Sequence, residues 1–106
     1  MIVARNVSIA FVEVDIVARR GRDYALVEVK TAKAPALPET SLCEEQRRRL
    51  LHARDHIRSR TREARHVEVL LAAVAVDPSL PSDAGAGPKT ELRFFRIGEL
   101  EEDSRH

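Results

Sequence analysis

The sequence predicts an α/β domain in which a mixed β-sheet of about five strands is flanked by one long helix. Residues 10–18 and 24–31 are two runs of alternating side chains, the period-two pattern of strands, with a glycine between them. A helical pattern follows residue 41. A valine-rich apolar run at 67–76 indicates a strand in the middle of the sheet, covered on both faces. The predicted order is therefore three strands, a helix and two strands.

The N-terminal part predicts a short strand followed by a hairpin. Residues 1–4 are apolar and indicate the end of a first strand that turns at Arg5-Asn6. Further along, Gly21-Arg22 suits a two-residue hairpin loop, because glycine tolerates positive φ. This loop, or a four-residue loop over 20–23, gives the same register for the two alternating strands.

That register brings charged side chains together on one face of the hairpin. Asp15 lies opposite Glu28, and Glu13 lies opposite Lys30, with opposed Cβ atoms roughly 4.5–5.5 Å apart. Glu13 and Lys30 form an opposite-charge pair, but Asp15 and Glu28 coexist only with a proton or a cation between them. The other face is wholly apolar, and the charged face also carries the apolar residues Phe11, Val17, Tyr24 and Leu26.

Three carboxylates and an amine among apolar neighbours favour a metal site. Mg²⁺ is the natural candidate, because it takes one or two carboxylates and keeps several waters for a phosphate-bearing substrate. The alternative is a solvent-facing pair of strands with ordinary cross-strand charges. An exposed face would more usually carry Thr, Lys, Arg or Gln than Phe11, Val17 and Leu26, so the metal site is the favoured interpretation.

A capping box marks the start of the helix, with Ser41 at the N-cap and Glu44 three positions later. The helix is expected over about 42–61. Gln46 falls on its apolar stripe, where a polar amide needs a partner. It is either a satisfied inward amide, which spacing alone favours, or a residue directed at the acidic site. The stripe consists of Leu42, Cys43, Leu50, Ala53 and Ile57.

The net charge of +1 conceals a basic segment at 47–65 and an acidic one at 99–103. Fifteen of the eighteen basic residues of the chain are arginine, whose planar fork suits phosphate. This favours contact with the backbone of a nucleic acid, although a charge run is also typical of a solvated helix face. The candidate contacts are Arg47, Arg48, Arg54 and Arg58.

The C-terminal half adds two strands. After the apolar strand at 67–76, a proline- and glycine-rich segment predicts a long loop over 77–90, and renewed alternation predicts a last strand at 91–97. We expect a single domain at 1–98 and an acidic tail at 99–106.

Composition narrows the class of protein. The single cysteine, Cys43, excludes an internal disulfide and a cysteine-based zinc cluster. Neither a secretory signal nor an apolar run near the ~20 residues of a membrane span is present, so a cytoplasmic protein without membrane contact is expected.

These motifs together resemble the PD-(D/E)XK nuclease superfamily, in particular its YraN-like endonuclease family, which is related to archaeal Holliday-junction resolvases. That family has a segment ending in Arg-Asn, a Gly-Glu-Ile-Asp-Leu-Ile-Ala strand, a Phe-Val-Glu-Val-Lys-Thr-Arg strand and a Gln-Arg-Arg-x-Leu helix. The resemblance implies a restriction-endonuclease-like fold. The matching segments here are 4–6, 12–18, 26–32 and 46–50, followed by the strands 67–76 and 92–97.

The resemblance also implies roles for the site residues. Asp15 and Glu28 would be metal ligands, joined by the backbone carbonyl of Val29. Lys30 would orient or deprotonate the attacking water and stabilise the charged phosphate. Glu13 would be an auxiliary acid that binds a second metal or holds Lys30. Gln46 would position the site or contact the nucleic-acid backbone. The expected metal is Mg²⁺ or Mn²⁺.

In two places the chain departs from the family pattern. The usual first helix, whose Glu helps to complete the site, precedes the point where this chain begins, so the expected fold lacks it. Val12 stands where the family has glycine. The leading hypothesis is a metal-dependent endonuclease acting on DNA, including branched or repair intermediates. The alternatives are an inactive nuclease-like module that binds nucleic acid or a protein, and an assembly module that forms a homodimer through an open sheet edge.

Overall fold

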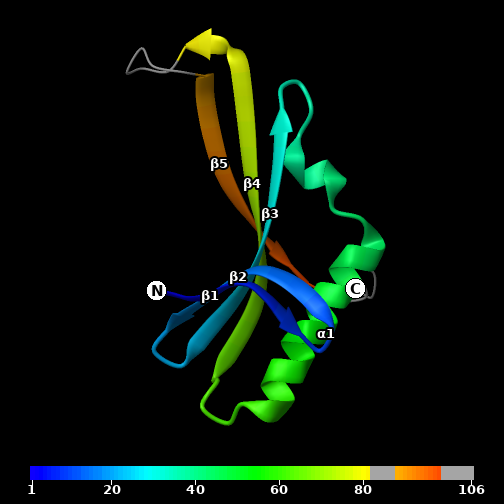
Figure 1. Ribbon diagram of the computed structural model, residues 1–106, viewed down its shortest axis with the longest axis vertical. Coiled ribbons are helices and arrows are strands. Elements are labelled where there is room, and N and C mark those ends of the chain that lie inside the picture. Colours follow the sequence, from blue (N-terminus) through cyan, green and yellow to red (C-terminus); the bar gives the residue numbers. More distant parts are fainter. Residues whose placement is uncertain (82–87, 99–106) are drawn as a thin grey trace, which may run out of the picture.

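The computed structural model describes residues 1–81 and 88–98, which form five strands, one α-helix and a short 3₁₀ helix. The mixed sheet of five strands with one long helix confirms the fold class expected from the sequence (Figure 1). The elements are β1 (Ile2–Ile9), β2 (Val12–Arg20), β3 (Asp23–Lys33), η1 (Pro38–Ser41), α1 (Glu44–Arg60), β4 (His66–Pro81) and β5 (Pro88–Ile97).

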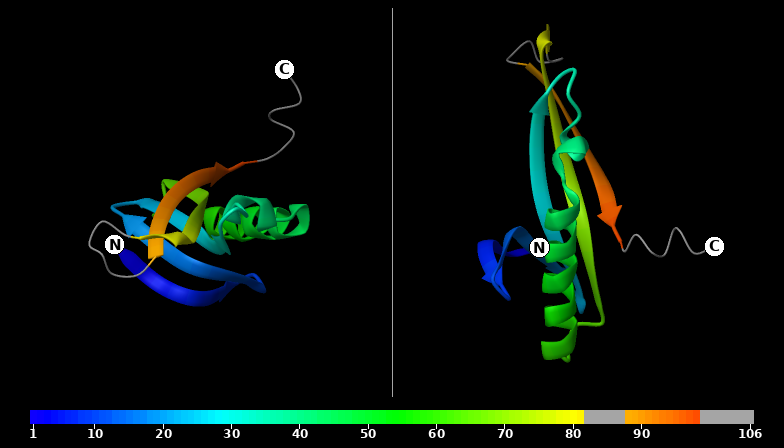
Figure 2. Two further views of the ribbon diagram at one scale, coloured as in Figure 1. Left: turned by 90° about the horizontal axis from the view of Figure 1, so that it is seen from above. Right: turned by 90° about the vertical axis from the view of Figure 1, so that its right-hand side faces the viewer.

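The strands make one sheet in the order β1-β2-β3-β4-β5. β3 and β4 are parallel, and the other neighbours are antiparallel. A parallel pair needs a crossover connection, and here η1 and α1 provide it. As Figures 1 and 2 show, α1 runs along one side of the strongly twisted sheet, and the hairpin of β1 and β2 curls toward it.

The hydrophobic core lies between α1 and the face of the sheet that carries the acidic residues. Leu26 shares this face with Glu28, because residues two apart in a strand point the same way, and its side chain is completely buried. Val27 points to the opposite face. The helix therefore covers the mixed face of β3 and of the second half of β2, whereas in the first half of β2 the buried core residues are Val12 and Val14 and Glu13 is exposed. The core consists of Val12, Val14, Val17, Leu26, Leu50, Leu51, Ala53, Val67, Val69, Leu71 and Ile97.

Within the described residues, no helix covers the other face of the sheet. Leu92 and Phe94 of β5 are 55% and 59% exposed there. The prediction that the strand at 67–76 lies inside the sheet is confirmed, because β4 pairs with a strand on each side, but the prediction that both of its faces are covered holds only in part. Val69 is fully buried on the helix side, whereas on the other face Ala72 is buried but Leu70 and Val74 are partly exposed. An apolar run indicates that a segment is hydrophobic, but it does not indicate which elements will pack against it.

The first strand is longer than the sequence indicates, and its turn lies elsewhere. β1 extends to Ile9, and the chain reverses at Ala10-Phe11 instead of at Arg5-Asn6. Asn6 has a φ of 50°, so the turn signal corresponds to a left-handed residue within the strand, and pairing with β2 continues on both sides of it. Asparagine adopts this conformation more readily than most residues.

The helix begins two residues later than expected. Ser41 belongs to η1, where its hydroxyl donates to the carbonyl of Pro38 (2.7 Å), and Cys43 is the N-cap of α1. The backbone N–H of Cys43 donates to Oε1 of Gln46 at 3.2 Å, so Gln46 supplies the reciprocal cap that was expected from Glu44. Among the described residues, no helix is long and apolar enough to cross a membrane.

The two C-terminal strands are also longer than expected. β4 continues to Pro81 and β5 begins at Pro88, so the predicted loop over 77–90 is strand at both ends. The residues between these strands and the predicted acidic tail at 99–106 lie outside the described part of the chain.

Truncating Leu26 tests the position of the core. Because Leu26 is fully buried beneath α1, Leu26→Ala is expected to lower the free energy of unfolding by about 2–5 kcal/mol, measured by urea denaturation. Leu92→Ala is the matched control. Its side chain is more than half exposed, so a loss of less than about 1 kcal/mol is expected. Equal losses in the two variants would contradict this placement of the helix.

Candidate metal centre

The β2–β3 hairpin positions the acidic residues. Its two-residue loop is Gly21-Arg22, and Gly21 has a φ of +62°. Arg20 pairs with Asp23, and the ladder runs to Ile16 opposite Val27. The register predicted from the sequence is confirmed over this length. Asp15 and Glu28 are the next residues on the two strands.

Beyond Ile16 and Val27 the backbone ladder of β2 and β3 ends. From there toward its N-terminus, β2 pairs with β1 alone. A side chain then replaces the backbone partner, because the N–H of Val29 donates to Oδ2 of Asp15 at 2.8 Å. Asp15 thus reaches β3 through its carboxylate and not as the ladder partner of Glu28. This hydrogen bond keeps the Asp15 carboxylate next to β3.

The carboxylates of Asp15 and Glu28 interact electrostatically. Burial raises the pKa of the Glu28 carboxyl above its ordinary value of 4.5, and the negative charge of Asp15 raises it further. Lys30 acts in the opposite direction, with its Nζ 3.5 Å from Oε2 of Glu28. The pKa remains raised in spite of this ion pair, because burial and the charge of Asp15 together outweigh the effect of Lys30.

The predicted pair of Glu13 and Lys30 is wrong. Lys30 forms its ion pair with Glu28, two residues away on the same face of β3. At Glu13, β2 has already left β3 and is paired with Ser8 of β1. Because the β1–β2 hairpin curves away from β3, Glu13 does not lie opposite Lys30 as it would in a flat sheet.

An open cavity of about 420 Å³ lies beside the acid pair. Its walls come from the β1–β2 turn, from both acidic strands and from the first half of α1, at the place where the hairpin curls toward the helix (Figure 1). The structure therefore brings together four of the residues singled out in the sequence. The lining residues are Phe11, Val12, Glu13, Asp15, Glu28, Gln46, Arg49 and Leu50.

The helix contributes two polar residues to this cavity. Gln46 lines the cavity while its Oε1 caps the helix. The two alternatives given for this residue from the sequence, a satisfied amide and a residue at the acidic site, are therefore both met by one side chain. Arg49 is three residues further on and 61% exposed, with an ion pair to Glu45 at 3.2 Å. Sequence reasoning missed Arg49, although its i+3 spacing from Gln46 is a usable signal.

Phe11 also lines the cavity, together with the apolar residues Val12 and Leu50, and the sequence did not single out any of these three as functional. The place of Phe11 at the cavity depends on the turn at Ala10-Phe11, which has no composition signal. Glu13 is exposed and lines the same cavity, but it does not complete a larger acidic cluster. In the part of the chain that the structure describes, no group of three or more Asp, Glu, His or Cys side chains is arranged to hold a metal ion.

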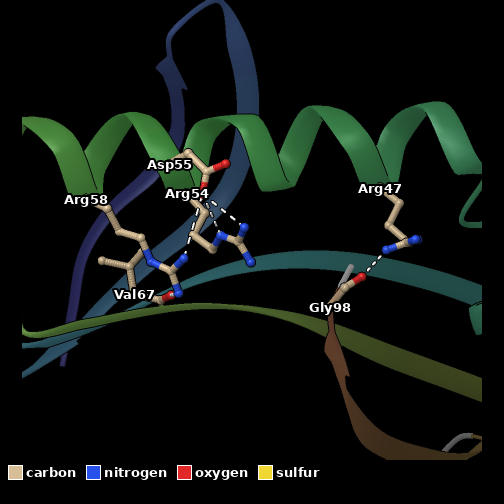
Figure 3. A network of polar contacts seen from close by, with 6 residues as sticks. All are labelled: Arg47, Arg54, Asp55, Arg58, Val67 and Gly98. Carbon is tan, nitrogen blue, oxygen red and sulfur yellow. Dashed lines mark hydrogen bonds and ion pairs between the residues drawn. The ribbon is translucent and has the colours of Figure 1, made fainter. Parts of the chain in front are cut away.

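The four arginines expected to contact nucleic acid do not line this cavity. Three of them hold partners within the protein, as Figure 3 shows, and Arg54 is buried at 8% exposure. Arg48 is exposed. The partners are the carbonyl of Gly98 for Arg47, Asp55 at 2.9 Å for Arg54, and Asp55 (3.7 Å) and the carbonyl of Val67 (3.2 Å) for Arg58.

The comparison with known proteins gives a family. A search of curated proteins found no match. The model of a family described as "Uncharacterised protein family UPF0102" matches residues 1–76, which include β1, β2, β3, α1 and most of β4. This range contains all of the acidic side chains at the cavity. The chain therefore belongs to UPF0102, the YraN-like family of the PD-(D/E)XK nuclease superfamily.

Proposed function

We propose that the protein is a metal-dependent endonuclease that hydrolyses phosphodiester bonds in DNA, including branched or repair intermediates. The observation that carries this proposal is the pair of Asp15 and Glu28 beside an open cavity, with the pKa of Glu28 raised by burial and by Asp15. Two partly buried like charges are unfavourable, and a divalent cation removes the conflict. The family is nuclease-like and related to Holliday-junction resolvases, which supports the same chemistry.

Asp15 and Glu28 would hold Mg²⁺ or Mn²⁺, hard cations that prefer oxygen ligands. Val29 would add its carbonyl. Its N–H donates to Asp15, and the N–H and C=O of a strand residue point to the same edge, so this carbonyl is directed to the same side of β3. Glu13 is a further carboxylate at the cavity. When bound, the metal would lower the pKa of a water and neutralise charge on the phosphate.

Lys30 is the cationic partner of the site. Its ammonium group lies 3.5 Å from Glu28, and its side chain is 20% exposed. From this position it would hold the Glu28 carboxylate in its ionised form and stabilise the negative charge that develops on a phosphate. The proposed role needs no change of partner, because one ammonium group can donate to both a carboxylate and a phosphate oxygen.

The basic residues of α1 would hold the nucleic-acid backbone. Arg48 is exposed, and Arg49 lines the cavity, so both are accessible to a phosphate. Arg47, Arg54 and Arg58 would have to exchange partners within the protein for phosphate oxygens, which costs part of the binding energy. We therefore assign the leading phosphate contacts to Arg48 and Arg49.

The second candidate is an inactive nuclease-like module that binds nucleic acid or a protein. One observation favours it: the described residues hold a pair of acids instead of a cluster of three. The exposed apolar face with Leu92 and Phe94 would give such a module a surface for a partner or for a second copy of the chain.

Cleavage assays separate the two candidates. With linear and four-way-junction DNA in Mg²⁺ or Mn²⁺, Asp15→Asn is expected to reduce the cleavage rate by roughly 10²-fold or more, because a metal ligand loses its charge. The asparagine still accepts the Val29 N–H, so the fold is retained. The cleavage rate of Lys30→Met is expected to fall by a similar factor.

Glu68→Gln is the control for charge removal. Glu68 pairs with Arg96 on the uncovered face of the sheet. The cleavage rate of Glu68→Gln should therefore match that of the unmodified protein. Binding of DNA without cleavage in either metal, unchanged in Asp15→Asn, would support the inactive module and exclude the enzyme.

The raised pKa of Glu28 predicts a pH dependence of stability in EDTA. Between the ordinary value of 4.5 and the folded pKa, the folded state binds more protons than the unfolded state, so stability falls as the pH rises through this window. Glu28→Gln lacks this loss, and we expect it to be the more stable protein above the window but not below 4.5, measured by urea denaturation.

Added Mg²⁺ should then stabilise the unmodified protein and leave Glu28→Gln nearly unchanged, because the ligand binds only the folded acid pair. A stability difference that is the same at every pH, or that metal does not alter, would show that Asp15 and Glu28 are not a coupled cation site.

A further inference from the structure

Phe11 is an apolar side chain held fully in water beside the acidic cavity. Its exposure is 103% of the reference value, so it contacts almost nothing in the protein, yet it lines the cavity that contains Asp15 and Glu28. A phenylalanine in this state contributes nothing to the core, in contrast to Val12, the next residue, which is buried. Its large apolar surface is available to a ligand.

The backbone that presents Phe11 is strained. Ala10 and Phe11 form the two-residue loop between Ile9 and Val12, with φ values of 51° and 67°. L-residues disfavour this left-handed region, and glycine or asparagine usually occupies such a loop. The turn therefore has a bulky aromatic where a glycine would relax the backbone. This arrangement is costly for folding and projects the ring outward.

Phe11 shares its cavity with charged side chains of both signs. The acid pair lies on the strands of the hairpin, and Arg49 lies on the helix that forms another wall of the same cavity. The cavity thus presents an apolar ring, a cation and the three carboxylates of Glu13, Asp15 and Glu28 to one ligand. An aromatic ring stacks on a base, and a guanidinium pairs with a backbone phosphate.

A base inside a duplex has both faces covered by its neighbours and cannot stack on a protein ring. Only a base that is unpaired or turned out of the helix offers a free face. A ring at the rim of the site therefore selects for a particular state of the strand near the bond that is cut. It does not select a sequence, since every base has such a face.

We propose that Phe11 is a stacking platform for an unpaired base next to the metal centre, so that the substrate class is single-stranded or locally unpaired nucleic acid. This inference rests on the proposed nuclease function for the meaning of the site, but binding alone tests it. Phe11 positions the strand, while Arg49 takes the adjoining phosphate.

Fluorescence anisotropy in EDTA tests the platform without hydrolysis, using a labelled single-stranded oligonucleotide and the matching duplex. Phe11→Ala should weaken single-strand binding by roughly tenfold and leave duplex binding nearly unchanged. Phe11→Tyr should restore single-strand binding. Phe94→Ala removes an exposed phenylalanine from the uncovered face of the sheet and should change neither affinity.

Phe11→Gly separates a ligand contact from a structural role. Glycine relieves the positive φ of 67°, so this variant should melt at a higher temperature than the unmodified protein and yet lose single-strand affinity as Phe11→Ala does. A residue retained only for folding would not lose ligand affinity as the protein becomes more stable.

The outcomes for the platform and for the nuclease are distinct. Four outcomes would each overturn the platform. Phe11→Ala could leave single-strand affinity unchanged, or it could lower duplex affinity equally. The unmodified protein could fail to bind, or it could change its oligomeric state in place of binding. Cleavage in Mn²⁺ with a raised KM and nearly constant kcat in Phe11→Ala supports both proposals. Binding that depends on Phe11 without any cleavage overturns the nuclease alone.

Discussion

The hydrogen bond from the Val29 N–H to the Asp15 carboxylate is the interaction on which the site depends. β2 has to pair with β3 along its second half and leave it along its first half, since the β1–β2 hairpin curls toward the helix. Where the strands part, backbone groups of β3 lose their ladder partners. The aspartate satisfies one of them and in doing so stays beside Glu28. The cavity and the acid pair are thus two results of one divergence between strands.

The helix determines the electrostatics of this place. α1 packs on the face of the sheet that carries the acids, with Leu26 buried beneath it, and so takes Glu28 partly out of water. Burial makes the carboxylate costly to ionise, and among the described residues Lys30 is the cation that compensates it directly. The strain at Ala10-Phe11 is a second local cost at the same cavity. Unfavourable features of this kind, a partly buried charge and a strained turn at one cavity outside the core, are typical of functional sites.

Much of the fold follows from local chemistry. Gly21 specifies the hairpin loop, and alternation on both sides of it specifies which residues share the acidic face, so the register of β2 and β3 was predictable. The turn at Ala10-Phe11 was not, because neither residue favours positive φ and Asn6 nearby does. Arg54 lies in an arginine-rich run that indicates a solvated face, yet its neighbours in space bury it. Such features depend on tertiary contacts, for which a single sequence carries no period or turn signal.

The burial of Arg54 affects how the basic helix would respond to salt. A cation that is already paired within the protein releases no counterion from a nucleic acid, so the dependence of affinity on salt concentration counts only the arginines that are free to change partner. The segment 47–65 has eight arginines, but Arg54 is tied to Asp55 and Arg58 to Asp55 and Val67. The dependence of affinity on salt concentration should therefore be weaker than eight arginines would give. The affinity for a nucleic acid would depend correspondingly more on contacts with the bases.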